Sequence, residues 1–588
     1  MFRIAAVFVF ASMALLGQTT RNVPAQFPTI QGAIAASQNG DTVLVAAGVY
    51  NESISFLGKS ITVVSQAGPQ TTIIQGSTGQ RVVTFAANEG PASILNGFTI
   101  TGGAGGVQMM RTSPTLMNCT IVGNTATNVG GGGVRIVSDL AGGNASPTFT
   151  NCRILNNACA GTSGAVFSNS GYNEAGGGGV VALVALSASL SLVFTGCTIA
   201  GNSSLGGYLG GGLFILQVNG TGAVNLAMTQ CDVQGNVGYL EGGGVFMQSF
   251  GSASFNRCRF LGNTAGVAFA NAANSSGGAA RIVNAGTTTF VNCLIAGNSV
   301  NGHAAAISAT GGGPNYNQGT LNIQSSTIVD NVGSGGAITT NLPGLTISSS
   351  IIRGGSPAPI ATIAPAPLFP AVSFSNIESV FGAQPTNIDV DPRFVDPANG
   401  DYHLATTSPC VNTGSLGVVT VPATDLDGSP RQVGQIDMGS DERPTATLPG
   451  SGADLDLYAR IDGGGDPLAT TVAGPAGSEL GVVLRSPGGT YVGAPVMIAG
   501  QLFATGAPPA LNAAFPMIQI NAFGTVLLYS TVGGAPFSQP GLSNLGVSLF
   551  YLIPPGFAGA TLRLQAFAVT PFAGPLGFVA TDARDVTL

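Results

Sequence analysis

Carboxylates able to do catalytic chemistry are sparse in the middle of this 588-residue sequence. Between residues 100 and 340 the acids are Asp139, Glu174, Asp232, Glu241 and Asp330. Hydrolysis of a glycosidic bond needs two neighbouring carboxylates, and elimination from an acidic polysaccharide needs several around Ca²⁺ together with a basic residue. In the repeat described below, Asp232 has no acid on either adjacent rung, whereas Glu174 and Glu241 could meet in space. The spacing therefore argues against either kind of catalysis without excluding it.

Three tyrosines suggest binding instead. Tyr172, Tyr208 and Tyr239 each fall a few residues before a glycine-rich run in successive repeats, and Glu174 and Glu241 lie beside two of them. Aromatic rings offer an apolar face on which sugar rings stack, while carboxylates accept hydrogen bonds from hydroxyl groups. We therefore predict a glycan-binding strip formed by these five residues. The alternative is that the three aromatic side chains only cover loop backbone.

A second group of acids lies in residues 389–442, which we call the closing region. Asp425, Asp427 and Asp437 could bind a hard cation such as Ca²⁺. Alternatively they pair with Arg431 and cap the amides of turns, which we favour because the spacing of an EF-hand loop is absent. No other cofactor is expected.

The sequence gives little support for catalytic histidines, or for disulfide bonds or metal binding by the cysteines. His303 and His403 have no triad context, and we expect both to be structural. Six of the eight cysteines occupy one slot of a repeat, where successive side chains are parallel and poorly oriented for disulfides. We expect stacked buried thiols, with Cys152–Cys159 as the one local pair to test. Metal binding by these cysteines is not expected, because CxxC spacing is absent.

The elements that position these residues are repeats. One unit recurs with Cys119, Cys152, Cys197, Cys231, Cys258 and Cys293 in the same slot, as in FTGCTIAGNSS at 194–204. The shortest interval between slots, 22 residues from Gly97 to Cys119, suffices for three short strands and three turns. Longer intervals add loops. Ten such coils at ~4.8 Å per rung would form a rod roughly 48 Å long.

Alternation within the unit assigns each position a direction. The cysteine and the apolar residue two positions later should face inward, and the residue between them outward. The outward row then reads Thr120, Arg153, Thr198, Asp232, Arg259, Leu294 and Thr327. Each unit ends in a turn with an asparagine, and a stacked column of these side chains would satisfy turn amides: Asn124, Asn157, Asn202, Asn236, Asn263, Asn298 and Asn331. Glycine runs such as 177–179 should form corners where no Cβ fits.

These motifs carry a resemblance. The glycine run followed by the Phe-x-x-Cys unit resembles the repeat of polymorphic outer-membrane and related β-helix proteins of the pectin-lyase-like superfamily. Residues 389–442, "DVDPRFVDPANGDYHLATTSPCVNTG…DLDGSPRQVGQIDMGSDE", resemble the segment that closes the β-helix in choice-of-anchor proteins. The resemblance implies a right-handed parallel β-helix of about ten coils over 23–388. The superfamily also includes polysaccharide lyases, pectin esterases and glycoside hydrolases, whose signatures are not found here.

Both ends differ from the repeats. Residues 1–17 have one basic residue followed by a thirteen-residue, mostly apolar run, the layout of a signal peptide too short to span a membrane comfortably. Thr29 to Ser37 should form a short helix that caps the first coil. Residues 451–588 lack the unit and should form an antiparallel β-sandwich. Its expected strands are Glu479–Arg485, Met517–Ile520, Thr525–Ser530, Val547–Ile553 and Thr561–Val569.

Composition narrows the partners. Only 7% of residues are charged, the net charge is −7, and Lys59 is the single lysine, so nothing offers the basic stripe that nucleic acid requires. With a signal peptide and no second apolar segment, the chain is expected outside the cell or at its surface. We expect an exported, non-catalytic protein with a structural, surface-associated or glycan-binding role, whose partner is a polysaccharide or another cell-envelope component. The alternative is a polysaccharide lyase or glycoside hydrolase.

Overall fold

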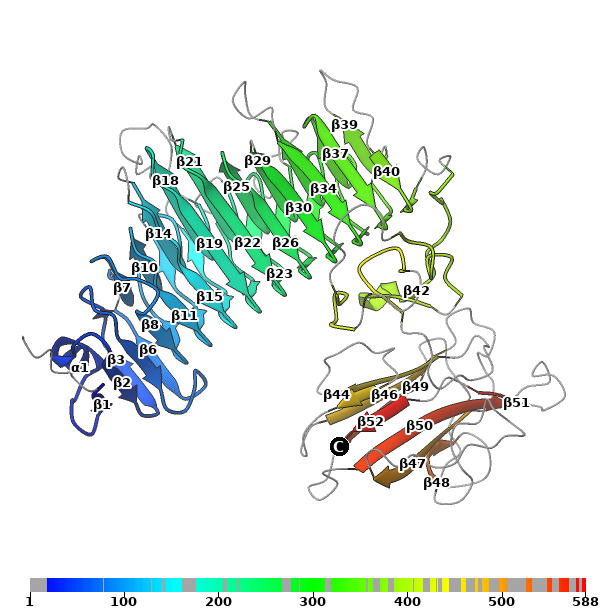
Figure 1. Ribbon diagram of the computed structural model, residues 1–588, viewed down its shortest axis with the longest axis horizontal. Coiled ribbons are helices and arrows are strands. Elements are labelled where there is room, and N and C mark those ends of the chain that lie inside the picture. Colours follow the sequence, from blue (N-terminus) through cyan, green and yellow to red (C-terminus); the bar gives the residue numbers. More distant parts are fainter. Residues whose placement is uncertain are drawn as a thin grey trace, which may run out of the picture.

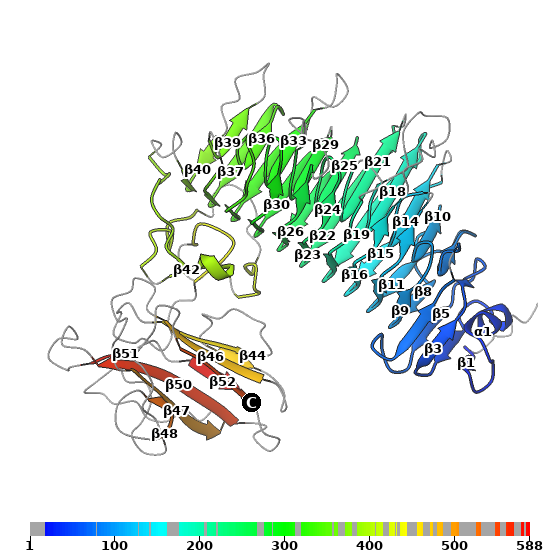
Figure 2. The same ribbon diagram turned by 180° about the vertical axis from the view of Figure 1, so that it is seen from behind.

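The computed structural model shows a long rod of stacked strands, a closing region beside its last coils, and a separate C-terminal domain (Figures 1 and 2). The structure describes residues 18–443 except for 78, 128, 140–142, 161–175, 205–208, 219–220, 267–275, 285, 312–318, 356–357, 363–370, 379–384, 406, 416–422, 430 and 432–435. Beyond residue 443 it describes the strands of the C-terminal domain. The predicted signal peptide, residues 1–17, lies outside the described residues.

Three parallel sheets run along the rod, because each coil contributes about one strand to each of them. Sheet A has 13 strands: β1 (Thr20–Val23), β2 (Thr42–Val45), β5 (Thr62–Ser65), β8 (Ile94–Asn96), β11 (Thr115–Met117), β15 (Thr148–Thr150), β19 (Leu190–Thr195), β22 (Val224–Thr229), β26 (Ala253–Asn256), β30 (Thr287–Val291), β34 (Thr320–Gln324), β37 (Gly344–Ser348) and β40 (Ala371–Ser373).

Sheet B, which follows the cysteine slot, has 12 strands: β3 (Gly48–Asn51), β6 (Thr72–Gln75), β9 (Thr99–Thr101), β12 (Thr120–Val122), β16 (Arg153–Leu155), β20 (Thr198–Ala200), β23 (Asp232–Gln234), β27 (Arg259–Leu261), β31 (Leu294–Ala296), β35 (Thr327–Val329), β38 (Ile351–Ile352) and β41 (Asn376–Ile377). Short strands extend the turn after it: β13 (Thr125–Ala126), β17 (Ala158–Cys159), β24 (Val237–Gly238), β28 (Thr264–Ala265) and β32 (Ser299–Val300).

Sheet C, which follows the glycine runs, has 11 strands: β4 (Ile54–Ser55), β7 (Val83–Phe85), β10 (Val107–Met110), β14 (Val134–Ser138), β18 (Val180–Ala185), β21 (Leu213–Val218), β25 (Val245–Ser249), β29 (Ala280–Asn284), β33 (Ile307–Thr310), β36 (Ile338–Thr340) and β39 (Ile360–Thr362). The predicted parallel β-helix is confirmed. Strands β1 to β7 show that coiling begins before the first slot recognised in the sequence.

The interior consists of ladders of like residues. Cys197 and Ile199 are both buried, as are their counterparts on the neighbouring rungs, which confirms the predicted inward positions. Phenylalanines of sheet A stack with ring centroids 4.8 Å apart for Phe149 and Phe194. All eight cysteines are buried thiols. Because every rung buries its apolar face against the next, stability comes from stacking.

The predicted asparagine column is confirmed, and its side chains accept hydrogen bonds from turn amides as expected. Each column residue donates its backbone N–H and its Nδ2 to Oδ1 of the next, as Asn202 does to Asn236 at 3.0 Å for both bonds. The left-handed position lies one residue earlier, at Gly201 (φ 63°) or Asn156 (φ 50°). The asparagines are therefore needed for their amide groups, not for tolerance of positive φ.

The glycine corners bring backbones into close contact. A Cβ atom added to Gly178 would lie 2.3 Å from the carbonyl oxygen of Ser203, a backbone atom that cannot rotate away. At the N-terminal end of the coil stack, helix α1 (Ile30–Ala36) confirms the predicted cap, with Thr29 as its N-cap. The Glu52 carboxylate accepts hydrogen bonds from the first two amides of this helix, at Ile30 and Gln31.

The C-terminal domain has two sheets, as expected for a sandwich. One contains β44 (Asp456–Ile461), β46 (Glu479–Arg485) and β49 (Val547–Leu552). The other contains β45 (Thr471–Ala473), β47 (Val496–Ala504), β48 (Thr525–Ser530), β50 (Ala560–Val569), β51 (Phe578–Ala580) and β52 (Arg584–Thr587). Its pairs are antiparallel except β45–β52. Four of the five predicted strands are confirmed, and Met517–Ile520 lies outside the described residues.

Candidate functional site in the closing region

The closing region folds back along the outer face of sheet B. Three residues of that face, Leu294, Val329 and Ile351, point out of the rod yet are almost fully buried. They form one apolar cluster with Leu404 and Met438 of the closing region. The segment therefore covers the side of the last coils in addition to following the end of the coil stack.

Polar contacts fix this arrangement across large distances in sequence. The hydroxyl of Thr327 accepts a hydrogen bond from the amide of Ser440 at 3.0 Å. The Nδ2 group of Asn292 donates to the carbonyl of Thr424 at 2.7 Å. Tyr402 donates its hydroxyl to Asp330 at 2.9 Å, and this contact together with burial raises the pKa of the tyrosine, burial being the larger cause.

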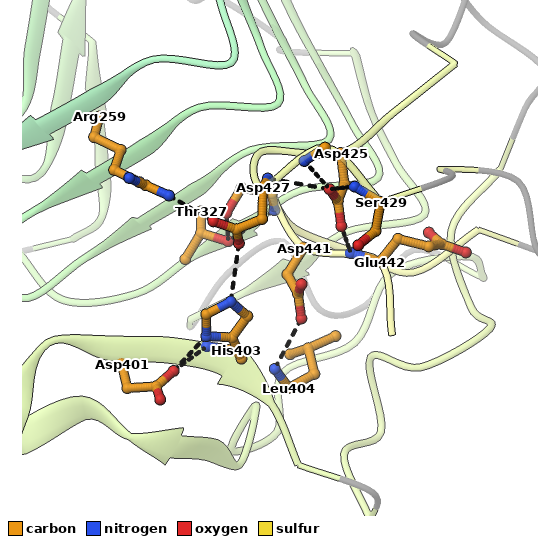
Figure 3. A network of polar contacts seen from close by, with 12 residues as sticks. Arg259, Thr327, Asp401, His403, Leu404, Asp425, Asp427, Ser429, Asp441 and Glu442 are labelled. Atoms are coloured by element: carbon orange, nitrogen blue, oxygen red, sulfur yellow. Dashed lines mark hydrogen bonds and ion pairs between the residues drawn. The ribbon is translucent and has the colours of Figure 1, made fainter. Parts of the chain in front are cut away.

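A chain of charged groups links the closing region to the rod (Figure 3). Strand β43 (Asp401–Leu404) carries Asp401 and His403 on one side, because side chains two residues apart in a strand share a face. It pairs with β42 (Phe394–Asp396), and a single 3₁₀ turn (Pro397–Asn399) joins the two strands.

The His403 ring lies between two carboxylates. Its Nδ1 contacts Asp401, and its Nε2 lies 2.9 Å from Oδ2 of Asp427. The other oxygen of Asp427 accepts a hydrogen bond from Arg259 of the rod at 2.5 Å. Arg259 also lies 3.9 Å from Asp232, its neighbour on the outward row.

Asp441 completes this group. Its Oδ2 accepts the amide hydrogen of Leu404 at 3.2 Å, which holds the carboxylate beside the histidine. One ligand atom from each of His403, Asp427 and Asp441 lies within 4.8 Å of the others. Burial alone would lower the pKa of His403, but Asp441, Asp401 and Asp427 outweigh it, so that the pKa lies well above its ordinary value.

Asp425 and Asp437, predicted from the sequence as cation ligands with Asp427, bind backbone amides. One oxygen of Asp425 accepts amide hydrogens from Asp427, Gly428 and Ser429 at 2.8 to 3.1 Å. The two oxygens of Asp437 accept from the amides of Asn412 and Arg443 at 2.6 and 2.7 Å. Burial raises the pKa of Asp437 despite these bonds.

Arg431 is fully buried among the carboxylates of the closing region. Its guanidinium donates to the backbone carbonyls of Asp437 and Gly439, and its Nε lies 3.7 Å from the Glu442 carboxylate. Burial lowers the pKa of Arg431, opposed by four surrounding carboxylates. A buried arginine ringed by acids and carbonyls holds the end of the closing region together.

Part of the predicted glycan strip falls outside the described residues, namely Tyr172, Glu174 and Tyr208. Tyr239 is described and partly buried. Glu241 lies 3.4 Å from Nε of Arg281, and burial raises the pKa of this glutamate. Bridges between Gly176 and Leu209 and between Leu209 and Glu241 place the residues preceding the glycine corners in one column.

Sequence reasoning missed Asp401 and Asp441 as partners of His403, and Arg259 as the partner of Asp427. The only local signal was the spacing of Asp401 and His403 within a strand-like segment. No protein-family model matches this chain, and no curated protein sequence matches it. Within the described residues, no helix is long and apolar enough to cross a membrane.

Proposed function

We propose that this chain is an exported, non-catalytic β-helix protein of the cell surface that binds glycan along its rod. The acids of the coils support this proposal. Asp139, Asp232 and Glu241 each lie within 4 Å of an arginine, at 2.6, 3.9 and 3.4 Å. Asp330 accepts the hydroxyl of Tyr402. These described coil acids thus contact arginines or a tyrosine, unlike the two neighbouring carboxylates that a glycosidase requires.

The resemblance to polymorphic outer-membrane repeats and to choice-of-anchor proteins supports a surface location. In that scheme the rod presents the binding edge, and the C-terminal sandwich serves as the anchor or as a second binding module. The edge itself is the column before the glycine corners, where Tyr239 and Glu241 lie. A cell-envelope polysaccharide is the partner that such an edge suits.

The test uses residues 18–588 incubated with neutral and acidic polysaccharides, with and without Ca²⁺. We expect retention of the protein on at least one polymer without new reducing ends or unsaturated products. Tyr172→Ala/Tyr239→Ala should weaken retention, whereas Tyr50→Ala, on sheet B near the other end of the rod, should not. Equal retention of the double variant and the wild type would refute the strip.

One observation favours the alternative, a carbohydrate-active enzyme. Asp232 and Asp427 flank the same guanidinium of Arg259. Burial raises the pKa of Asp232, which Arg259 partly offsets. Cleavage of any polymer that is lost in Asp232→Asn would establish this second function and overturn the first.

A further inference from the structure

The group formed by His403, Asp427 and Asp441 has the composition of a metal centre. The three residues come from strand β43 and from two later turns of the closing region, so only the folded chain brings them together (Figure 3). Zinc and related ions bind imidazole nitrogen and carboxylate oxygen at about 2.0 to 2.2 Å. Ligands at that distance lie about 3 to 4 Å from one another, so a spread of at most 4.8 Å requires only small side-chain movements.

Each of the three side chains is oriented by a contact through its other polar atom. Asp401 contacts Nδ1 of His403, the arrangement in which a carboxylate orients a metal-binding imidazole. Arg259 binds Oδ1 of Asp427, and the Leu404 amide binds Oδ2 of Asp441. These outer partners turn one atom of each side chain toward the shared centre. The carboxylates are mostly buried, which limits screening by water.

Charge supplies an independent argument. Within the described residues, six carboxylates gather here: Asp401, Asp425, Asp427, Asp437, Asp441 and Glu442. The cationic side chains that interact with these carboxylates include Arg259, His403, Arg431 and Arg443, and Arg257 approaches the same turn at Gly428. The carboxylates outnumber these cationic groups, and Arg259 is shared with Asp232 as well. Buried excess charge is costly unless a counterion neutralises it.

We propose that His403, Asp427 and Asp441 bind one divalent first-row transition ion, such as Zn²⁺ or Mn²⁺. The imidazole ligand favours these ions over Ca²⁺, which prefers an all-oxygen shell. The ion would fasten the closing region where it meets Arg259 of the rod. This site is independent of the proposed glycan strip, which lies at the glycine corners.

The experiment titrates residues 18–588, first stripped with a chelator, with Co²⁺ alone. We expect one equivalent to bind with the absorption bands of a coordinated ion, and Zn²⁺ to displace it. Asp441→Asn and His403→Gln should bind at least ~10-fold more weakly, and the outer variant Asp401→Asn about 10- to 100-fold more weakly. Asp139→Asn, which removes a carboxylate from an arginine pair elsewhere on the rod, is the matched control and should bind like the wild type.

Two results would overturn the proposal. One is the absence of stoichiometric Co²⁺ binding by folded wild-type protein, which would indicate that bound protons, and not a metal ion, neutralise the excess carboxylates. The other is wild-type affinity for Co²⁺ in both His403→Gln and Asp441→Asn, which would place any bound ion elsewhere. Circular dichroism checks that each variant folds, and because the wild-type titration is itself decisive, an unfolded variant does not leave the question open. Retention on polysaccharide is measured separately.

Discussion

Replacing Asn202 by alanine should destabilise the coils on both sides of it. The side chain donates Nδ2 to the Ile154 carbonyl at 2.9 Å and to Asn236 at 3.0 Å. Its Oδ1 accepts the backbone amide of Asn157 at 3.0 Å and the Nδ2 of the same residue at 3.1 Å. All of these groups are buried, so water cannot replace the lost partners without opening the turn.

The magnitude follows from these contacts. The Asn157 amide loses its partner at a cost of about 1–3 kcal/mol, and each remaining lost bond costs about 0.5–1 kcal/mol. Together these losses amount to about 2.5–6 kcal/mol, and we expect about 3 kcal/mol, near the lower end, because some groups keep a second contact. Two of the other groups keep a second contact, since Nδ2 of Asn157 still donates to the Ile121 carbonyl and Oδ1 of Asn236 still accepts the backbone N–H of residue 202.

The assay is hydrogen exchange followed by mass spectrometry, because a long repeat array need not unfold in one step. A loss of 3 kcal/mol corresponds to exchange about 100-fold faster in the coils of Asn157 and Asn236. Asn225→Ala is the matched control, because its Oδ1 accepts one bond, from the Ser252 amide, at an exposed position. Equal exchange in the two variants would show that the column adds no net stability.

Three further results are expected. Gly178→Ala should lower the free energy of unfolding by about 1–3 kcal/mol, because its Cβ would meet the Ser203 backbone. Gly90→Ala should not lower it, because no atom lies within 4 Å of the added Cβ. Equal denaturation midpoints for the two variants would refute this prediction. Arg259→Ala, which leaves Asp427 without its partner from the rod, should make the closing region more sensitive to limited proteolysis; an unchanged cleavage pattern would refute its role. A thiol reagent should label essentially none of the cysteines in the native protein and all eight after denaturation, so rapid native labelling would contradict their burial.

The rod was predictable because its contacts are periodic. Each rung packs on the rung before it, so the spacing of cysteine, isoleucine and asparagine already specifies inward and outward positions. The sandwich strands Glu479–Arg485 and Thr525–Ser530 were predicted with their observed bounds, because runs of apolar residues end at glycine and proline turns. Both kinds of signal are local in the sequence.

The candidate site was not predictable by the same means. Arg259 and Asp427 are 168 residues apart, and Asn292 and Thr424 are 132 apart. No periodicity relates the closing region to a particular face of the rod. The sequence showed a cluster of aspartates, but which of them face a histidine and which cap amides depends on how the segment folds back.

The outward row of sheet B nevertheless indicates where the closing region folds back against the rod. Thr120, Arg153, Thr198, Asp232 and Arg259 stand in register on successive rungs and remain partly or fully accessible. The next rungs continue the row with Leu294, Thr327 and Ile351, which are buried.

An outward row that changes from polar and charged residues to mainly apolar ones needs a cover, since an exposed apolar stripe on a rod invites association. Arg259 stands at the change, and it is the residue that pairs with Asp427. The residue types on the outward row therefore indicate where the covered part of sheet B begins. In a β-helix of this kind, the rung at which the outward row turns apolar should locate where a following segment docks, with a charged residue at that rung as its electrostatic partner.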